Sequence, residues 1–523
     1  MMIPRNDRPA MNREPGWVPT FQVFLAVAAL MLVGSVPAAR DIMFELGDAA
    51  ANTLLILDAK HGILLKGNYS RIGFNHPGPA YLYVMAVGEA VFHDLLRLTA
   101  TPFGGQILGT AVLNAGWLAL LWFLLARMSR SAGAAALGLG AFTVQAALTD
   151  PDFLFGFWMP FLYFPTFAVF TLALARVAAG RLDGLVPLAL STGFLLHGHA
   201  SFIGIAGLTG AIAVAAHFLA ARWLPPDAWP RLASLETLRR GRGHIAAAAV
   251  VMAVFLLPPA VQTILHFPGP LGQYAGYGAG HHANPPGASL AYVLACWSGA
   301  ALVPAALLPA LLLRTSGRDE PSALPSRLGF LISAGAASLA VLFYTVFGVD
   351  FLSEAYIIYF YRAVPALLAA MIAIAVHRSL GWNLARRCLA GAGIAAVAFL
   401  LITGQRQQHH TEAGIPAAFQ DLVRFQPGPA VLDLDRDGDW VAVWSRTAGL
   451  LAYAKRLGPP AYCLRGHWHI LFTEALRCPP ATAPGTPVLT VFAGGEGQGG
   501  GTPGKAADTL TALGLRFVRS TAP

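Results

Sequence analysis

Residues 47–83 of this chain read GDAAANTLLILDAKHGILLKGNYSRIGFNHPGPAYLY. The segment follows the first long apolar run, Phe21 to Val36, so we expect it to begin where a membrane span ends. Only 12% of the chain is Asp, Glu, Lys or Arg, yet polar groups gather here. They are Asp48, Asp58, His61, Lys66, Arg71, Asn75 and His76. Polar groups concentrated at a membrane surface indicate a functional site at the lipid boundary.

The composition is that of a membrane protein. The chain has 523 residues, of which 56% are hydrophobic, and its mean hydropathy is +0.58. Soluble domains carry about 25% charged residues, roughly twice the fraction found here. Apolar runs close to the ~20-residue spanning length recur from Trp17 to Gly404. The sequence therefore predicts a polytopic α-helical membrane protein.

The charge pattern predicts how the chain is oriented. The net charge of +9 lies mostly in short loops between apolar runs, which is typical of orientation signals rather than of nucleic-acid binding. We expect a cytoplasmic tail over residues 1–16 and a transmembrane domain over residues 17–404, with about eleven spans. The first span is either an uncleaved anchor, which the many later spans favour, or a signal peptide.

The first external loop, residues 39–96, contains a second apolar piece, Ala80 to Leu96, which is interrupted by Glu89, His93 and Asp94. If this piece spanned the membrane, the loop with Arg127 and Arg130 would lie outside, against the positive-inside rule. We therefore predict a juxtamembrane or re-entrant helix.

The composition changes near Gln405, and residues 405–523 are predicted to form a small extracytoplasmic α/β domain. An amphipathic helix is expected over Arg446 to Arg456, ending at Gly458. Short strands are expected at Ala430–Leu434, Pro487–Val491 and Leu515–Val518.

Two features of this domain have more than one interpretation. Cys463 and Cys478 could pair as a disulfide outside the cytoplasm, but their spacing fits two free thiols nearly as well. Asp433 to Gly438 begins like a calcium-binding loop, yet position twelve is Trp444 instead of Glu. A strand that runs into an acidic turn is the favoured interpretation.

The opening segment also carries a resemblance to a known class. An acidic residue after the first span is followed by a helical stretch, the block GNYSRIGFNHPGP at residues 67–79, and a tyrosine-rich helix. This order resembles the GT-C class of membrane glycosyltransferases, which includes protein mannosyltransferases and lipid A aminoarabinose transferases. Within that class it is similar to a bacterial group with the HPGP signature. Where the aminoarabinose transferases have a Lys-Pro-Pro block, this chain has Asn75-His76-Pro77. Further similar pieces are Trp158–Pro160, His197–His199 and Pro258–Gly272.

The resemblance implies a substrate class and a location. The donor would be a sugar on a polyprenyl phosphate, and the acceptor a lipid, glycan or protein at the outer face of the bacterial inner membrane. The N-terminus would be cytoplasmic and the C-terminal domain extracytoplasmic. Membrane lipids are the expected surroundings and no nucleic acid is involved. No cofactor is certain, and a divalent cation is the one candidate.

Asp48 is the candidate general base. A sugar on a phosphate carrier already has a good leaving group, so the enzyme mainly needs a base for the acceptor hydroxyl. In the class, an acid in the first external loop has this role, and Asp48 has the matching position. Asp41, Glu45 and Asp58 are competitors. The alternative role for Asp48 is to cap a helix over Ala49 to Lys60.

Several residues are candidates for holding the donor. Arg71, Asn75 and His76 could contact phosphate or sugar, since the guanidinium group of an arginine suits phosphate. The alternative is a structural turn with Arg71 at the lipid headgroups. Arg362 is a candidate for the lipid phosphate, or it extends to the headgroups. The remaining candidates are His199 and Tyr274 for substrate, and Asp150 and Asp152 as weak metal ligands.

Two other function classes compete with the transferase. A transporter or flippase for a lipid-linked saccharide predicts charges in mid-membrane and an inverted repeat. Neither is evident, because most polar groups lie near predicted span ends. An inactive relative of the class, acting as a partner subunit, is the third possibility.

Overall fold

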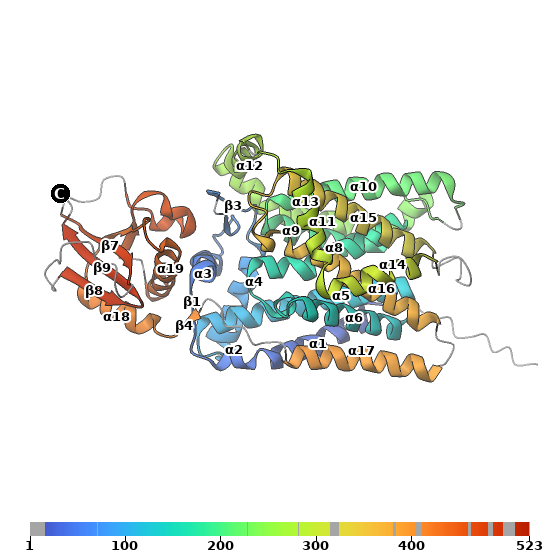
Figure 1. Cartoon of the computed structure of the whole chain (residues 1–523), viewed down its shortest axis with the longest axis horizontal. Coiled ribbons are helices and arrows are strands. Elements are labelled where there is room, and N and C mark those ends of the chain that lie inside the picture. The colour runs from blue at the N-terminus through green and yellow to red at the C-terminus, as the bar shows by residue number, and fades with distance from the viewer. Residues whose placement is uncertain are drawn as a thin grey trace, which may run out of the picture.

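The computed structural model describes residues 16–70, 72–226, 229–280, 282–313, 324–379, 383–403, 411–458, 462–479, 485–494 and 508–521. A long helical bundle carries a small sheet domain at one end (Figure 1). We call the end of the bundle that faces this domain the domain end. The predicted class, a polytopic helical protein with a small α/β domain, is confirmed.

Within the described residues, eight helices are long and apolar enough to cross a membrane. They are α1 (Trp17–Gly34), α5 (Pro102–Ser129), α6 (Ala132–Thr149), α8 (Met159–Ala178), α10 (Ser201–Trp223), α11 (Leu235–Leu265), α15 (Leu324–Phe347) and η7 with α16 (Ala355–Arg362 and Ala363–Ser379). The helices α13 (Pro286–Leu294) and α14 (Leu302–Leu313) belong to a bent apolar pair, which forms either a broken ninth span or a re-entrant loop. The sequence predicted about eleven spans, more than the eight or nine found among the described residues; α9 (Leu185–Gly198) is apolar but shorter, and α17 (Asn383–Thr403) is a further helix of the bundle.

The apolar run from Leu290 to Leu313 predicts one continuous span, but the chain is bent there. The structure bends by 80° between residues 297 and 299. Ser298 has an extended backbone and Gly299 has a φ of +59°, a left-handed conformation that favours glycine. These two residues end the first helix and allow the turn.

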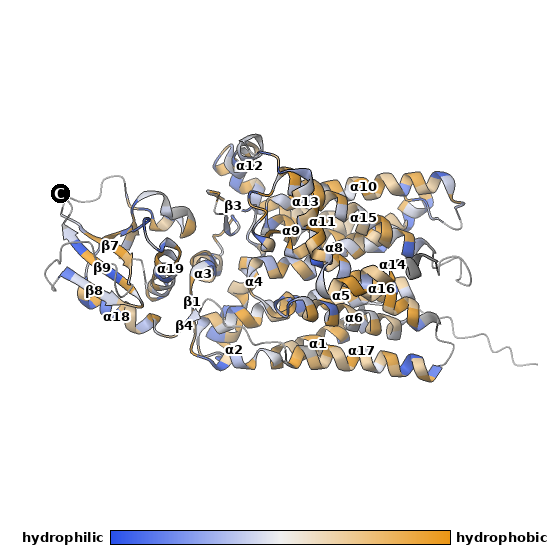
Figure 2. Ribbon diagram, viewed as in Figure 1, coloured by the Kyte–Doolittle hydropathy of each residue, from blue (hydrophilic) through white to orange (hydrophobic). Residues whose placement is uncertain are grey.

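The bundle is organised around α8. The apolar part of α8 is completely buried, whereas none of the apolar window of α11 is buried. Many large apolar side chains of the bundle are exposed, as a lipid-facing surface requires. Figure 2 shows that the helices of the bundle consist mainly of hydrophobic residues. Glycines allow close helix contacts. An added Cβ at Gly140 of α6 would lie 2.7 Å from the Cα of Gly393 in α17.

The predicted juxtamembrane helix is formed by α4 (Ala80–Gly88), which continues as one π-helical segment, η1 (Glu89–Leu95). It packs against α5, where Gly88 meets Gly109 so closely that an added Cβ would lie 2.6 Å from the Gly109 Cα. Glu89 is buried in this contact region. A buried carboxylate needs a cation, and the cation comes from the other domain, as described below.

The C-terminal domain is a five-stranded sheet with strand order β6-β5-β7-β9-β8. The strands β6, β5 and β7 are parallel, and β9 and β8 continue the sheet antiparallel. The helices α18 (Ile415–Phe425) and α19 (Trp440–Leu457) pack with it. Cys463 and Cys478 form a disulfide. The strands are β5 (Ala430–Leu434), β6 (Tyr462–Leu464), β7 (Pro487–Ala493), β8 (Thr509–Ala512) and β9 (Leu515–Thr521).

The helix α3 (Gly47–Lys60) joins the two parts of the molecule. Its residues Ala50, Ala51 and Leu54 are almost fully buried in the core of the C-terminal domain, against α19. In Figure 1, α3 lies between the sheet domain and the bundle. A two-stranded ladder of β1 (Phe44–Glu45) and β4 (Thr411–Glu412) lies beside it. The segment that follows the first span is therefore shared by the two domains.

Ion pairs strengthen this junction. Arg456 of α19 contacts Glu45 at 2.7 Å and Glu89 at 2.6 Å, and both carboxylates are 2% exposed. Lys60 reaches Glu89 at 2.8 Å. Lys455 pairs with Asp58 at 2.7 Å. Burial alone would raise the pKa of Glu89, but the neighbouring Arg456 and hydrogen bonds lower it to about 2.

Candidate functional site

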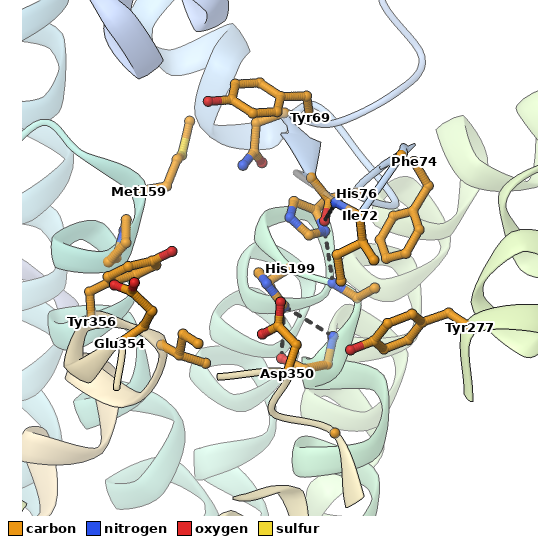
Figure 3. Close-up of a pocket in the computed structure, with 18 of the residues that line it drawn as sticks. Tyr69, Ile72, Phe74, His76, Met159, His199, Tyr277, Asp350, Glu354 and Tyr356 are labelled. Carbon is orange, nitrogen blue, oxygen red and sulfur yellow. Dashed lines mark hydrogen bonds between the residues drawn. The ribbon is translucent and has the colours of Figure 1, made fainter. Parts of the chain in front are cut away.

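A cavity of about 1240 Å³ lies between the domain end of the bundle and the C-terminal domain. Its walls come from α3, a hairpin of β2 (Tyr69–Ser70) and β3 (Phe74–Asn75), the loops before α8 and α10, α12 (Gly269–Gly280), α15, and the segment before η7. The C-terminal domain adds Arg436, Trp440, Val441, Trp444, Trp468 and Leu471. Figure 3 shows the part of this cavity that is formed by the bundle and its loops.

Asp48 lines the cavity in the first turn of α3. Gly47 has a φ of +53°, a conformation that favours glycine, and it turns the chain from β1 into the helix. The residue that precedes the helix is Leu46, and no side chain caps this end. Asp48 therefore does not act as a side-chain cap of this helix, which was the alternative role.

Two donors hold the Asp48 carboxylate. The Tyr69 hydroxyl donates to Oδ1, and the Trp158 indole nitrogen donates to Oδ2 at 2.7 Å. Burial, and then the Asp48 charge, raise the pKa of Tyr69, so its hydroxyl keeps the proton that it donates. Among the described residues, no Lys, Arg or His forms an ion pair with Asp48. The carboxylate is oriented but not neutralised.

The hairpin β2–β3 carries the HPGP block to the cavity. His76 lines the cavity, whereas the Asn75 side chain donates to the Gly67 carbonyl at 3.1 Å and is not part of the lining. The Tyr274 hydroxyl donates to the Asn75 carbonyl at 2.6 Å, and Tyr274 lines the cavity. Asn75 thus supports the hairpin, and its neighbours face the cavity.

His76 and His199 lie side by side in the cavity wall, with ring centroids 4.1 Å apart and ring planes inclined by 35° (Figure 3). His76 Nδ1 accepts a hydrogen bond from the Ala200 N–H at 3.3 Å. His199 Nδ1 pairs with the Ser201 hydroxyl at 2.8 Å. Burial, and then the neighbouring His199, lower the pKa of His76. Burial lowers the pKa of His199 to about 4, although Asp350 acts in the opposite direction. Both rings are therefore neutral at pH 7.

Acidic groups are more numerous than cations around the cavity. Asp350 lies next to His199, while Glu354 and Tyr356 lie on the side opposite Phe74 and Tyr277 (Figure 3). The described residues of the lining include three carboxylates, Asp48, Asp350 and Glu354. Among the same residues, Arg436 is the one Lys or Arg side chain.

The competitors of Asp48 lie elsewhere. Glu45 is paired with Arg456 and Asp58 with Lys455, so both belong to the junction between the domains. Asp41 is exposed and does not line the cavity. Of the four acids that the sequence offered near the first span, Asp48 alone lines the cavity.

The remaining candidates are not brought to the cavity. Arg71 lies outside the described residues. Arg362 is half-buried and its guanidinium lies 5.8 Å from the Tyr359 ring, away from the cavity lining. Asp150 and Asp152 also lie outside the lining, and the Asp152 N–H donates to Asp150 Oδ1. Among the described residues, no three His, Cys, Asp or Glu side chains are grouped closely enough to hold a metal ion.

Sequence reasoning missed several lining residues. Asn52 lines the cavity one helical turn after Asp48, and that spacing of four could have indicated it. Asp350 and Glu354 show the same spacing of four in the loop between α15 and η7. Trp158 was noted only as part of a turn. The tryptophans of the C-terminal domain gave no local signal, because the docking of two domains brings them to the cavity.

Comparisons with known proteins give a fold but no closer relative. No family model matches the chain, and no curated protein matches it in sequence. Among solved structures, the chain is similar to ArnT from Cupriavidus metallidurans in the apo state, with a TM-score of 0.51 and 15% identity. It is likewise similar to ArnT bound to undecaprenyl phosphate, with a TM-score of 0.50 and 16% identity. Each match covers 91% of this chain and 93% of the other. ArnT is a lipid A aminoarabinose transferase, and the predicted GT-C-type fold is confirmed.

Proposed function

We propose that this chain is a membrane glycosyltransferase that takes a sugar from a polyprenyl phosphate and transfers it to a hydroxyl of a lipid, glycan or protein. The observation that carries the proposal is the Asp48 carboxylate in the wall of a large cavity, where Tyr69 and Trp158 orient it and no cation of the described residues forms an ion pair with it. The similarity of the whole chain to ArnT, including a structure bound to undecaprenyl phosphate, supports the donor class.

In the proposed reaction, an Asp48 oxygen accepts the proton of the acceptor hydroxyl. The acceptor oxygen attacks the anomeric carbon, and the bond between that carbon and the phosphate oxygen breaks. The electron pair leaves with the polyprenyl phosphate, so the direct attack inverts the anomeric centre. Tyr69 and Trp158 fix the direction of the carboxylate, which is a positioning role. Neutral His76 and His199 would accept or donate hydrogen bonds to the sugar without adding charge.

The lining suggests where the lipid part of the donor lies. One wall is apolar and belongs to two helices of the bundle, with Ile205 of α10 and Phe343 and Phe347 of α15. Both phenylalanines are more than half exposed, at 55% and 52%, and α10 packs beside α15. This wall suits an isoprenoid chain arriving from the bilayer. The C-terminal domain closes the opposite side, so the acceptor would arrive from the water.

We further propose that the protein is a multi-pass protein of the bacterial inner membrane, with its domain end outside the cytoplasm. The strongly basic segment Arg222–Arg242 follows α10, which begins at the cavity, and so lies at the other end of the bundle. The positive-inside rule places that end in the cytoplasm. A disulfide in the C-terminal domain fits an oxidising compartment.

The test is transfer by the purified protein in a bilayer, with a panel of polyprenyl-phosphate sugars as donors and membrane lipid extract as acceptor. Asp48→Asn should abolish transfer, while Asp41→Asn, the matched change at an exposed acid of the same loop, should leave it intact. Both variants should unfold at the temperature of the wild type. Full activity of Asp48→Asn would show that Asp48 is not the general base.

A further inference from the structure

The C-terminal domain presents an aromatic surface to the cavity. Trp440 and Trp468 both line it, with ring centroids 6.0 Å apart and planes inclined by 42°. The Arg436 guanidinium lies 5.0 Å from the centre of the Trp468 ring. We call these three residues the tryptophan shelf. Trp440 is 44% exposed and so is accessible to a ligand, whereas Trp468 is 8% exposed.

A helix cap and a disulfide support the shelf. Trp440 is the first residue of α19, and the Asp439 side chain caps this helix by accepting from the Ala442 N–H at 3.1 Å. Trp468 belongs to the short helix η8 (Gly466–Leu471), which lies inside the loop closed by the disulfide between Cys463 and Cys478. A ligand that stacks on a fixed ring loses less conformational entropy on binding than one that must order a mobile loop.

The shelf is continuous with Asp48. Trp444 lies one turn after Trp440 on α19, so both rings project from the same face of the helix. Trp444 donates to the Leu471 carbonyl at 3.5 Å and meets the Tyr69 ring edge-on at 6.1 Å. Tyr69 in turn holds Asp48. One aromatic wall therefore leads from the candidate base to the shelf.

We propose that the tryptophan shelf is a saccharide subsite, which binds a sugar ring of a glycan acceptor beyond the ring that carries the attacking hydroxyl. One face of a pyranose ring presents C–H groups with partial positive charge, and these complement the negative face of an indole. Arg436 beside Trp468 would donate hydrogen bonds to ring hydroxyls. The identification of the bound sugar as part of the acceptor rests on the proposed function. The binding of a sugar ring to the shelf does not depend on that function.

The surroundings argue against other ligand classes. The shelf belongs to the sheet domain beyond the end of the apolar bundle, so an isoprenoid chain would have to leave the bilayer to reach it (Figure 2). Arg436 is flanked by the half-buried Asp435 and the exposed Asp437 on one turn. The local charge is therefore not positive, and a ligand rich in phosphate would be repelled. A neutral ring with a C–H face and polar edges fits both observations.

The test is saturation-transfer NMR on the full-length protein, in a detergent without a sugar headgroup. The probes are free disaccharides of neutral hexoses and of N-acetylhexosamines. Wild-type protein and Asp48→Asn should both transfer saturation to the ring C–H protons of at least one probe. Trp440→Ala should weaken this binding roughly tenfold, the loss expected for one stacked ring, and Trp440→Phe should retain part of it.

The matched control is Trp223→Ala, because Trp223 is 77% exposed but lies at the end of α10 remote from the cavity. This variant should bind the probe like the wild type. The inference is overturned if no probe is saturated by the wild type, or if Trp440→Ala binds as well as Trp223→Ala while both remain folded. If Asp48→Asn stays active in transfer but binding still depends on Trp440, the catalytic proposal fails and the saccharide subsite stands.

Discussion

Replacement of Arg456 by methionine is the sharpest test of how the two domains are joined. Arg456 lies between Glu45 and Glu89, at 2.7 Å and 2.6 Å, and its side chain is 10% exposed. Methionine keeps much of the apolar stem but removes the cation. Glu89 would retain Lys60 at 2.8 Å and Gln106 as partners. Glu45, which is 2% exposed, would be left without a cation among the described residues.

The expected loss follows from this geometry. Removing one partner of a buried ion pair destabilises by about 3–5 kcal/mol, because the remaining charge is buried without compensation. The remaining partners of Glu89 argue for the lower end, so we expect about 3 kcal/mol, which is a factor of roughly 100 in an equilibrium constant. An exposed pair gives the matched control. Arg240→Met removes a contact to Glu236 in which both side chains are over 70% exposed, and it should cost less than about 1 kcal/mol.

Hydrogen exchange followed by mass spectrometry is the appropriate assay, because the effect is local. Peptides from α3 and α19 should lose protection by about a hundredfold in Arg456→Met, while peptides from α6 should not change. A second replacement, Glu45→Gln in the Arg456→Met background, removes the orphaned charge and should restore part of the protection. Unchanged exchange in α3 and α19 of Arg456→Met would refute the account of the junction.

Three further predictions concern the site and the C-terminal domain. Tyr69→Phe and Trp158→Phe each remove one hydrogen-bond donor to Asp48. Each should lower kcat about tenfold, corresponding to the ~1–1.5 kcal/mol of one hydrogen bond, without a large shift in unfolding temperature. If both variants kept the wild-type kcat, these donors would not position the base. The double replacement Cys463→Ser and Cys478→Ser opens a loop with a sequence separation of 15 and should destabilise the C-terminal domain by about 3 kcal/mol. The loss should appear as faster hydrogen exchange in β6 than in the wild type, and an unchanged exchange rate would contradict this prediction. The pKa of His199 is lowered to about 4, so between pH 6.5 and 4 the unfolded chain binds a proton that the folded site excludes. The stability that neutral His199 contributes is therefore complete above pH 6.5 and falls as the pH drops toward 4. His199→Gln should make the unfolding temperature less dependent on pH over this range, and an equal pH dependence in the two proteins would argue against a neutral buried His199.

Local patterns in the sequence predicted the elements of the fold but not their assembly. Apolar runs of spanning length give helices wherever lipid is the solvent, so the main helices followed from hydropathy alone. The bend at Ser298 and Gly299 did not, because a single glycine in a left-handed conformation has no hydropathy signal. The sharing of α3 with the C-terminal domain depends on contacts between residues about 400 positions apart, such as the hydrogen bond from Lys455 to the Leu54 carbonyl.

The candidate site shows the same division. Asp48 was identified from the resemblance to the GT-C class together with its place after the first span, and the structure sets it in the cavity wall. Asn75 and Arg362 were chosen for their chemistry, yet the fold directs the Asn75 side chain to a backbone carbonyl and Arg362 toward Tyr359. Trp440 and Trp468 became candidates only when the docked domains placed them in the lining of the cavity that Asp48 also lines. A residue type indicates what a side chain can do, whereas long-range packing decides which cavity it reaches.

The central claim is that the chain transfers a sugar and does not merely move a lipid-linked one. The most direct measurement is the simultaneous quantification of polyprenyl phosphate released and glycoside formed, in liposomes that contain the purified protein and a labelled polyprenyl-phosphate sugar. The account predicts that the two products appear in equal amounts, with inverted anomeric configuration, and that both disappear in Asp48→Asn. Movement of intact donor across the bilayer without release of polyprenyl phosphate would contradict it and identify a transporter.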